Sequence, residues 1–224
     1  MTGRIYAQDC EPEKPLFNFK RVATRSGGTL EVIREYSYPD GKPAAREHVL
    51  YNGNALVSFD LEEIQLGAKG GAKIRREPQH SETGRIEFEY TKTPEPNARP
   101  KPRSEVLAPD TLIADMMGPF LGENWDRLAR GEKVKCRYIV VPRRETVGFT
   151  FSKESESTWR SSEVIILRME PSSRLLATLV KPLFFTLEKQ PPHRVLQYVG
   201  RTTLKIQAGD KWKDLDAVTI FDWQ

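Results

Sequence analysis

Cysteine is scarce in this chain of 224 residues, which contains only Cys10 and Cys136. Two cysteines so far apart exclude a disulfide-rich scaffold, because such scaffolds need several closely spaced pairs. We interpret Cys136, which lies in an alternating apolar run, as a buried structural thiol and Cys10 as an exposed free one; a disulfide between them, if the protein is secreted, is the alternative.

Long apolar runs and a strong charge of one sign are also missing. No stretch approaches the ~18 consecutive apolar residues that a transmembrane helix needs. The 35 basic and 31 acidic residues leave a net charge of only +4, which is too small to indicate a nucleic-acid site. We therefore predict neither a transmembrane segment nor nucleic acid as a partner.

The common catalytic signatures are absent as well. The sequence contains no G-x-S-x-G elbow, P-loop, G-x-G-x-x-G fingerprint or H-E-x-x-H motif. His48, His80 and His193 stand apart from one another, whereas a metal site usually gathers its ligands at short spacing. We therefore predict no metal and no other cofactor.

Alternation of apolar and polar residues is the strongest pattern present. It predicts roughly ten to twelve antiparallel strands, separated by hairpin turns such as Pro39-Asp40-Gly41 and Asn52-Gly53. In the first third of the chain it is carried by Phe17, Phe19, Leu30, Val32, Tyr36, Tyr38, Ala45, Val49, Tyr51, Val57, Phe59 and Leu61.

A single convincing helix interrupts the strands. Its apolar residues fall on one face: Leu112, Ile113, Met116, Met117, Phe120, Leu121, Trp125 and Leu128. Gly118-Pro119 predicts a kink or a division into two short helices. Because so apolar a helix needs a cover, we predict a mainly β (α+β) fold, in which a large curved antiparallel sheet or open β-barrel wraps around one kinked helical segment.

Strands on both sides of the helix favour one domain. We predict a flexible N-terminal arm over residues 1–14 and a single β-barrel-like domain over residues 15–224. Residues 93–103 contain four prolines and form its surface loop. Two domains joined at this loop are the alternative.

Aromatic and methionine side chains are the candidate ligand-binding residues. In a sheet that is open at one end they would line an apolar groove for an acyl chain or a peptide. A plain hydrophobic core filled by the helix is the alternative. The candidates are Met116, Phe120, Trp125, Tyr138, Phe149, Phe151, Phe184 and Phe185.

Glu154 and Glu156 are the best candidate catalytic pair. Two positions apart on a strand, their carboxylates would point the same way at about 7 Å, which overlaps the separation in glycosidases. Their parity is opposite to that of Phe149 and Phe151, and this favours a solvated outer face. A carboxylate-dependent hydrolase acting on envelope glycan is therefore the alternative function.

Four segments carry a resemblance to a known family: VLAPDTL at 106–112, LARGE at 128–132, LFF at 183–185 and RVLQYVG at 194–200. In this order they resemble uncharacterised exported bacterial β-proteins of domain-of-unknown-function family 3108, over residues 15–205. The resemblance implies a barrel-like antiparallel sheet and a place in the bacterial cell envelope. It supplies no catalytic residues.

Location and function follow as expectations. Ile5-Tyr6-Ala7 resembles the tail of a signal peptide, although the first fifteen residues lack its apolar core. We predict a periplasmic or exported protein if a signal peptide is encoded upstream of this chain, and a cytoplasmic one otherwise. The predicted function is non-enzymatic: the concave sheet binds an apolar ligand (an acyl chain or lipid) or another envelope protein.

Overall fold

The computed structural model describes residues 1–8, 14–77, 80–92, 102–178 and 180–223. Its strands are β1 (Thr2–Ala7), β2 (Phe17–Ser26), β3 (Thr29–Ser37), β4 (Pro43–Asn52), β5 (Ala55–Glu63), β6 (Ala68–Glu77), β7 (His80–Thr91), β8 (Arg103–Val106), β9 (Thr111–Leu112), β10 (Val134–Val140), β11 (Glu145–Trp159), β12 (Ser162–Pro171), β13 (Leu183–Glu188), β14 (Val195–Ala208) and β15 (Lys211–Asp222). Short helices are η1 (Ile64–Leu66), η2 (Ala114–Met116), α1 (Met117–Glu123), α2 (Trp125–Ala129), η3 (Val141–Arg143) and α3 (Arg174–Ala177), where η marks a 3-10 helix.

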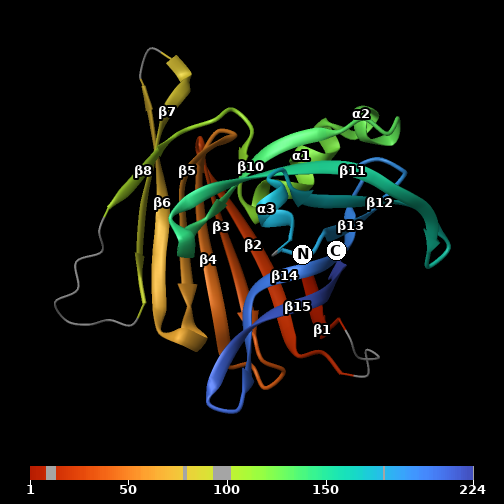
Figure 1. Ribbon diagram of the computed structural model, residues 1–224, viewed down its shortest axis with the longest axis horizontal. Helices are drawn as coiled ribbons and strands as arrows, with labels where there is room; N and C mark the ends of the chain where they lie inside the picture. Colours follow the sequence, from red (N-terminus) through yellow and green to blue (C-terminus); the bar gives the residue numbers. More distant parts are fainter. Residues whose placement is uncertain (9–13, 78–79, 93–101, 179, 224) are drawn as a thin grey trace.

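All of these strands belong to one sheet, in the order β8-β7-β6-β5-β4-β3-β2-β1-β15-β14-β13-β12-β11-β10-β9. Neighbouring strands are antiparallel, except that β9 and β10 are parallel. The first and last strands pair in the middle of the sheet, where Thr2 lies opposite Asp222 (Figure 1). The predicted mainly β fold with one large curved sheet is confirmed. Residues 93–101 of the predicted surface loop lie outside the described residues.

The sheet curls until its two ends meet through side chains. Glu105 of β8 accepts hydrogen bonds from the backbone N–H and the hydroxyl of Thr146 in β11, at 2.9 and 2.8 Å. Arg103 of β8 lies 3.7 Å from the carboxylate of Glu145. Because β8 and β9 do not pair along their backbones, the sheet is an open barrel whose seam is held by these contacts.

The prediction of a flexible arm over residues 1–14 is wrong for its first part. Residues 2–7 form β1, which pairs with β2 on one side and β15 on the other. Ile5 is fully buried there, in the same core cluster as Phe17 and Phe19. The segment is short, and its partner β15 lies at the other end of the sequence, so local alternation could not reveal it. Residues 9–13 lie outside the described residues.

The walls of the barrel contact each other across the interior. The side-chain amide of Gln65 in η1 donates to the carbonyl oxygen of Lys205 in β14, and its oxygen accepts from the Lys205 N–H, each at 2.9 Å. Thr203 of β14 also reaches Glu47 of β4. These contacts join β14 to η1 and β4 on the concave side of the sheet.

The predicted helix is present but divided. Residues 114–129, here called the helical plug, comprise η2, α1 and α2, and the break falls at Asn124 rather than at Gly118-Pro119. Pro119 is the third residue of α1, within the first turn, where no backbone donor is needed. Figure 1 shows α1 and α2 together at one end of the molecule, beside β10 and β11.

The plug is packed by its apolar face. Met117, Phe120, Leu121 and Leu128 share one buried cluster with strand residues of β10 to β14, which include Phe151, Leu167 and Leu187. We call this set the apolar cluster. Met116 packs against it and also against a second cluster built on β3 to β7. The plug therefore lies where two parts of the core meet.

Candidate functional site

A group of charged side chains lies inside the barrel, where alternation places apolar residues. Arg21, Arg34 and Glu47 form a row across β2, β3 and β4: Arg21 is opposite Arg34, and Arg34 is opposite Glu47. Glu47 is only 2% exposed, and Arg34 8%. Asp115 approaches this row from η2 of the plug. We call Arg21, Arg34, Glu47 and Asp115 the charged pole.

Asp115 attaches the plug to the wall of the barrel. Its two carboxylate oxygens accept hydrogen bonds from Nε and Nη2 of Arg21, at 2.6 and 3.1 Å. The hydroxyl of Tyr51 donates to it at 2.9 Å. Burial alone would raise the pKa of Asp115, but the hydrogen bonds and charge of Arg21 and the charge of Arg34 lower it below the usual 3.8. The carboxylate is therefore ionised at neutral pH.

Arg34 and Glu47 form the second ion pair of the pole. Glu47 also accepts from the hydroxyls of Tyr36 and Thr203, at 3.2 and 3.3 Å. Burial would lower the pKa of Arg34, but the charge of Glu47 raises it above its ordinary value. Burial raises the pKa of Tyr36, so its hydroxyl stays protonated and serves as a donor.

The chemistry of the charged pole is that of anion recognition. Guanidinium groups and tyrosine hydroxyls are the donors that hold carboxylates and phosphates in proteins. Here they hold two carboxylates of the chain itself, and two positive charges balance two negative ones. Among the described residues no group of three or more His, Cys, Asp or Glu side chains could hold a metal ion.

The alternation contained a signal for these residues. The inward positions of β3 read Val32, Arg34, Tyr36, and those of β4 read Ala45, Glu47, Val49. A charge that interrupts an apolar series at inward parity must be buried, and a buried charge needs a partner. Arg34 and Glu47 are such interruptions on adjacent predicted strands, so the pair could have been proposed. Asp115 could not, because its approach depends on the tertiary fold.

The predicted ligand-binding residues mostly gather in or against the apolar cluster. Phe120, Phe149, Phe151 and Phe185 are buried members, and Met116, Trp125 and Tyr138 pack against them. Phe184 has the opposite parity on β13 and is half-buried, outside this set. Their role in ligand binding stays a prediction.

Trp125 joins α2 to the turn between β13 and β14. Its ring stacks on the imidazole of His193, with centroids 3.7 Å apart and planes at 11°. His193 precedes β14 in the turn from β13, and its backbone φ is 57°. The plug is thus held at two points, by Asp115 at one end and Trp125 at the other.

Glu154 and Glu156 both lie on the exposed stretch of β11. Glu156 forms ion pairs with Lys153 and Lys189, and Glu154 lies 3.8 Å from Arg168. Hydrogen bonds from Lys153 and Lys189 lower the pKa of Glu156 to about 2. A general acid needs a raised pKa, so these contacts oppose that role for Glu156.

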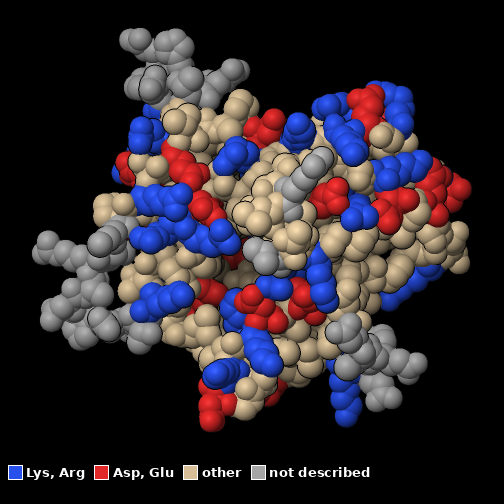
Figure 2. Space-filling model, viewed as in Figure 1, with Lys and Arg blue, Asp and Glu red and all other residues tan. Residues whose placement is uncertain are grey.

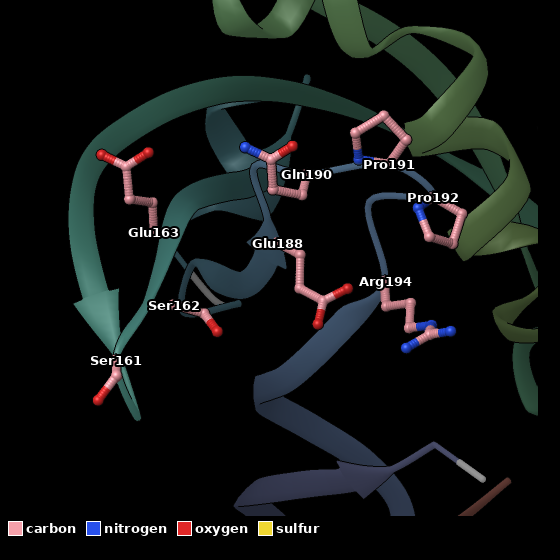
Figure 3. Close-up of a pocket in the computed structure, with 8 residues that line it drawn as sticks. All are labelled: Ser161, Ser162, Glu163, Glu188, Gln190, Pro191, Pro192 and Arg194. Carbon is pink, nitrogen blue, oxygen red and sulfur yellow. The ribbon is translucent and has the colours of Figure 1, made fainter.

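Two pockets open on the outside of the molecule. One, of about 480 Å³, lies between the β11–β12 and β13–β14 turns, and Figure 3 shows Glu188 at its centre with Arg194 to one side and Ser162 to the other. The second, of about 580 Å³, lies over β4 to β7 and has charged residues of both signs, among them Arg46, Asp60 and Lys69. Neither is lined by a predicted ligand-binding residue.

The thiol of Cys136 is buried and free, as predicted for a structural cysteine. Burial, together with the charge of Asp110, raises its pKa to about 12, which suppresses the reactive thiolate. Cys10 lies outside the described residues. No helix among the residues described is long and apolar enough to cross a membrane.

Comparisons with known proteins add little to these observations. No protein-family model matches the chain, and no curated protein matches its sequence. Among solved structures, the chain is similar to a beta-barrel-like protein of domain of unknown function DUF1849 from Brucella abortus. The identity is 8% and the TM-score 0.40, over 99% of this chain and 96% of the other. The resemblance to family 3108 stays a prediction.

Proposed function

We propose that this protein is a non-enzymatic binding protein of the bacterial envelope, which holds a single apolar chain on the concave side of its sheet. One observation carries the proposal: the concave side already receives an apolar segment, the helical plug, through a face made of Met117, Phe120, Leu121 and Leu128. A surface that packs these side chains presents the same apolar contacts to an acyl chain.

The shape of α1 supports an exchangeable plug. The helix has seven residues, including Gly118, Pro119 and Gly122. So short a helix with two glycines is unstable by itself, and its conformation depends on packing against the sheet. A ligand that takes over this packing competes with a segment that has little structure of its own.

Binding of N-phenyl-1-naphthylamine, a neutral dye that fluoresces in apolar surroundings, tests the proposal. Trp125 packs against the apolar cluster, so a variant in which Trp159, Trp212 and Trp223 are changed to Phe reports on that site alone. We expect dye fluorescence to rise to a 1:1 end point while Trp125 emission falls, and dodecanol to reverse both changes.

Leu175 of α3 supplies the control, because its side chain is 75% exposed outside the apolar cluster. Leu175→Asp should leave dye binding unchanged. A dye signal that disappears in Leu175→Asp while Trp125 emission stays constant would mean surface adsorption, and it would refute an interior site.

The envelope location is part of the same proposal and rests on the resemblance to family 3108. Fractionation of the host cell, with periplasmic and cytoplasmic marker proteins run in parallel, tests it. We expect the protein with the periplasmic markers. Recovery with the cytoplasmic markers alone would contradict the location without affecting the dye experiment.

A further inference from the structure

We propose that Arg21 and Arg34 are the head-group site for a single-chain amphiphile with an anionic head, and that Asp115 occupies this site until the ligand replaces it. The inference rests on the proposed function and adds the chemical class of the ligand and the element that moves. In this account the plug is an internal substitute for the ligand.

The plug has the chemical layout of such an amphiphile. At Asp115 it presents a carboxylate to Arg21 and the Tyr51 hydroxyl. The next residues, Met116 and Met117, begin the apolar part that packs into the core. A fatty acid likewise has one carboxylate followed directly by an apolar chain. The carboxylate of the plug contacts the charged pole, and its apolar part contacts the apolar cluster.

Charge balance selects the sign of the ligand. Arg21 and Arg34 are balanced by Glu47 and Asp115. An anionic head that replaces Asp115 keeps the charged pole neutral and keeps the guanidinium of Arg21 hydrogen-bonded. A neutral head would leave Arg21 without its anion, and a cationic head would add repulsion; both are unfavourable inside a protein.

The head-group site can be reached from solvent. The side chain of Arg21 is 28% exposed, although that of Asp115 is only 3% exposed. Figure 2 shows acidic and basic side chains close together over the face of the molecule that it views. A charged head can therefore contact the guanidinium of Arg21 from the solvent side before it displaces the carboxylate.

Calorimetric titration with four twelve-carbon compounds tests the inference: dodecanoate, dodecyl phosphate, dodecanol and dodecyltrimethylammonium, each below its micelle concentration. We expect both anions to bind at least about tenfold more tightly than dodecanol, and the cation most weakly. Preference between the two anions separates a carboxylate head from a phosphate head, since both are anionic and differ in geometry.

Two variants locate the site, and a third serves as their control. Arg21→Met should weaken dodecanoate binding by about tenfold or more and should not weaken dodecanol binding, because a neutral head does not use the guanidinium. Asp115→Asn should strengthen dodecanoate binding, because it removes the competing anion. Arg25→Met is the matched control: Arg25 has the same parity on β2 but is exposed, so neither affinity should change. Circular dichroism of each variant verifies its fold.

The outcomes separate this inference from the proposed function. If all four compounds bind with equal affinity, the anionic head-group site is refuted while an apolar site stands. If none binds and the dye also fails, the proposed function itself is refuted. If Arg25→Met weakens the anions as much as Arg21→Met does, or Asp115→Asn weakens dodecanoate, the assignment to the charged pole is wrong.

Discussion

The carboxylates inside the barrel and those on the outer face of β11 both form ion pairs with Arg or Lys, but they differ in their exposure to water. Asp115 and Glu47 have side chains 3% exposed, whereas Glu156, between Lys153 and Lys189, is 41% exposed. Water can replace a lost partner on the outer face but not in the interior. Ion pairs at the surface therefore contribute little, while breaking a buried pair leaves a charge without compensation.

The largest effect should come from breaking the interior pair. Glu47→Gln keeps the size of the side chain but leaves Arg34 without its counter-ion, and we expect the free energy of unfolding to fall by about 3–5 kcal/mol. Urea denaturation measures it. The double variant Glu47→Leu/Arg34→Met should recover most of the loss; if it is less stable than the single variant, the desolvation argument is wrong.

Removing the contact between Asp115 of the plug and Arg21 of the barrel wall should lower the free energy of unfolding by a smaller amount. Asp115→Asn removes a charge from hydrogen bonds with Arg21 and Tyr51, and hydrogen bonds to charged groups contribute about 1.5–3 kcal/mol. We expect a decrease of about 2 kcal/mol in urea denaturation at pH 7. A variant as stable as the parent would show that Asp115 does not hold the plug.

Lowering the pH should remove the stabilisation that the ionised Asp115 carboxylate provides. The folded pKa of Asp115 is depressed below 3.8, so its stabilisation is present above that value and is lost as the pH falls through the folded pKa. The stability difference between the parent and Asp115→Asn should be constant from pH 7 to about pH 5 and shrink below about pH 4. A difference that grows on acidification would contradict the ionised state assigned here.

A substitution that stabilises α1 should make the plug harder for the ligand to replace. A Cβ at Gly122 would meet no atom within 4 Å, so Gly122→Ala fits and should stabilise the helix by about 0.5–1 kcal/mol. If the plug competes with the ligand, dodecanoate affinity should fall by a similar free energy. Unchanged affinity in a stabilised variant would show that α1 stays in place when ligand binds.

The outer-face pair should give the smallest effect. Glu156→Gln removes the carboxylate from Lys153 and Lys189, yet water replaces both contacts. We expect the melting temperature and the dodecanoate affinity to stay within experimental error. A marked loss of stability would mean that position in the fold, inside or outside, does not decide what an ion pair contributes.

Sequence patterns predicted the sheet because alternation and hairpin turns are local. In β3 and β4, for example, the alternation is formed by Val32, Tyr36 and Val49. The turns between strands contain residues that favour hairpins. The sheet order could be predicted only where successive strands form hairpins. Pairing of β1 with β15 joins residues 2 and 222, and nothing in either segment specifies the other.

The site was less predictable, for a related reason. Phe151 and Phe185 lie in one cluster with Phe120 of the helix, whereas Phe184 lies outside it. The charged pole was not predicted, because Arg34 and Glu47 interrupt the apolar alternation instead of continuing it. Asp115 precedes the apolar residues of the plug, and only the position of η2 against β2 and β4 gives it partners.

Hydrogen–deuterium exchange of the plug tests most directly the claim that it is replaced by the ligand. With saturating dodecanoate, peptides covering residues 114–129 should exchange faster than in the free protein, while peptides from β3 and β4 should exchange at the same rate or more slowly. Slower exchange of residues 114–129 at full occupancy would contradict the account, because the ligand would then add to the plug instead of taking its place.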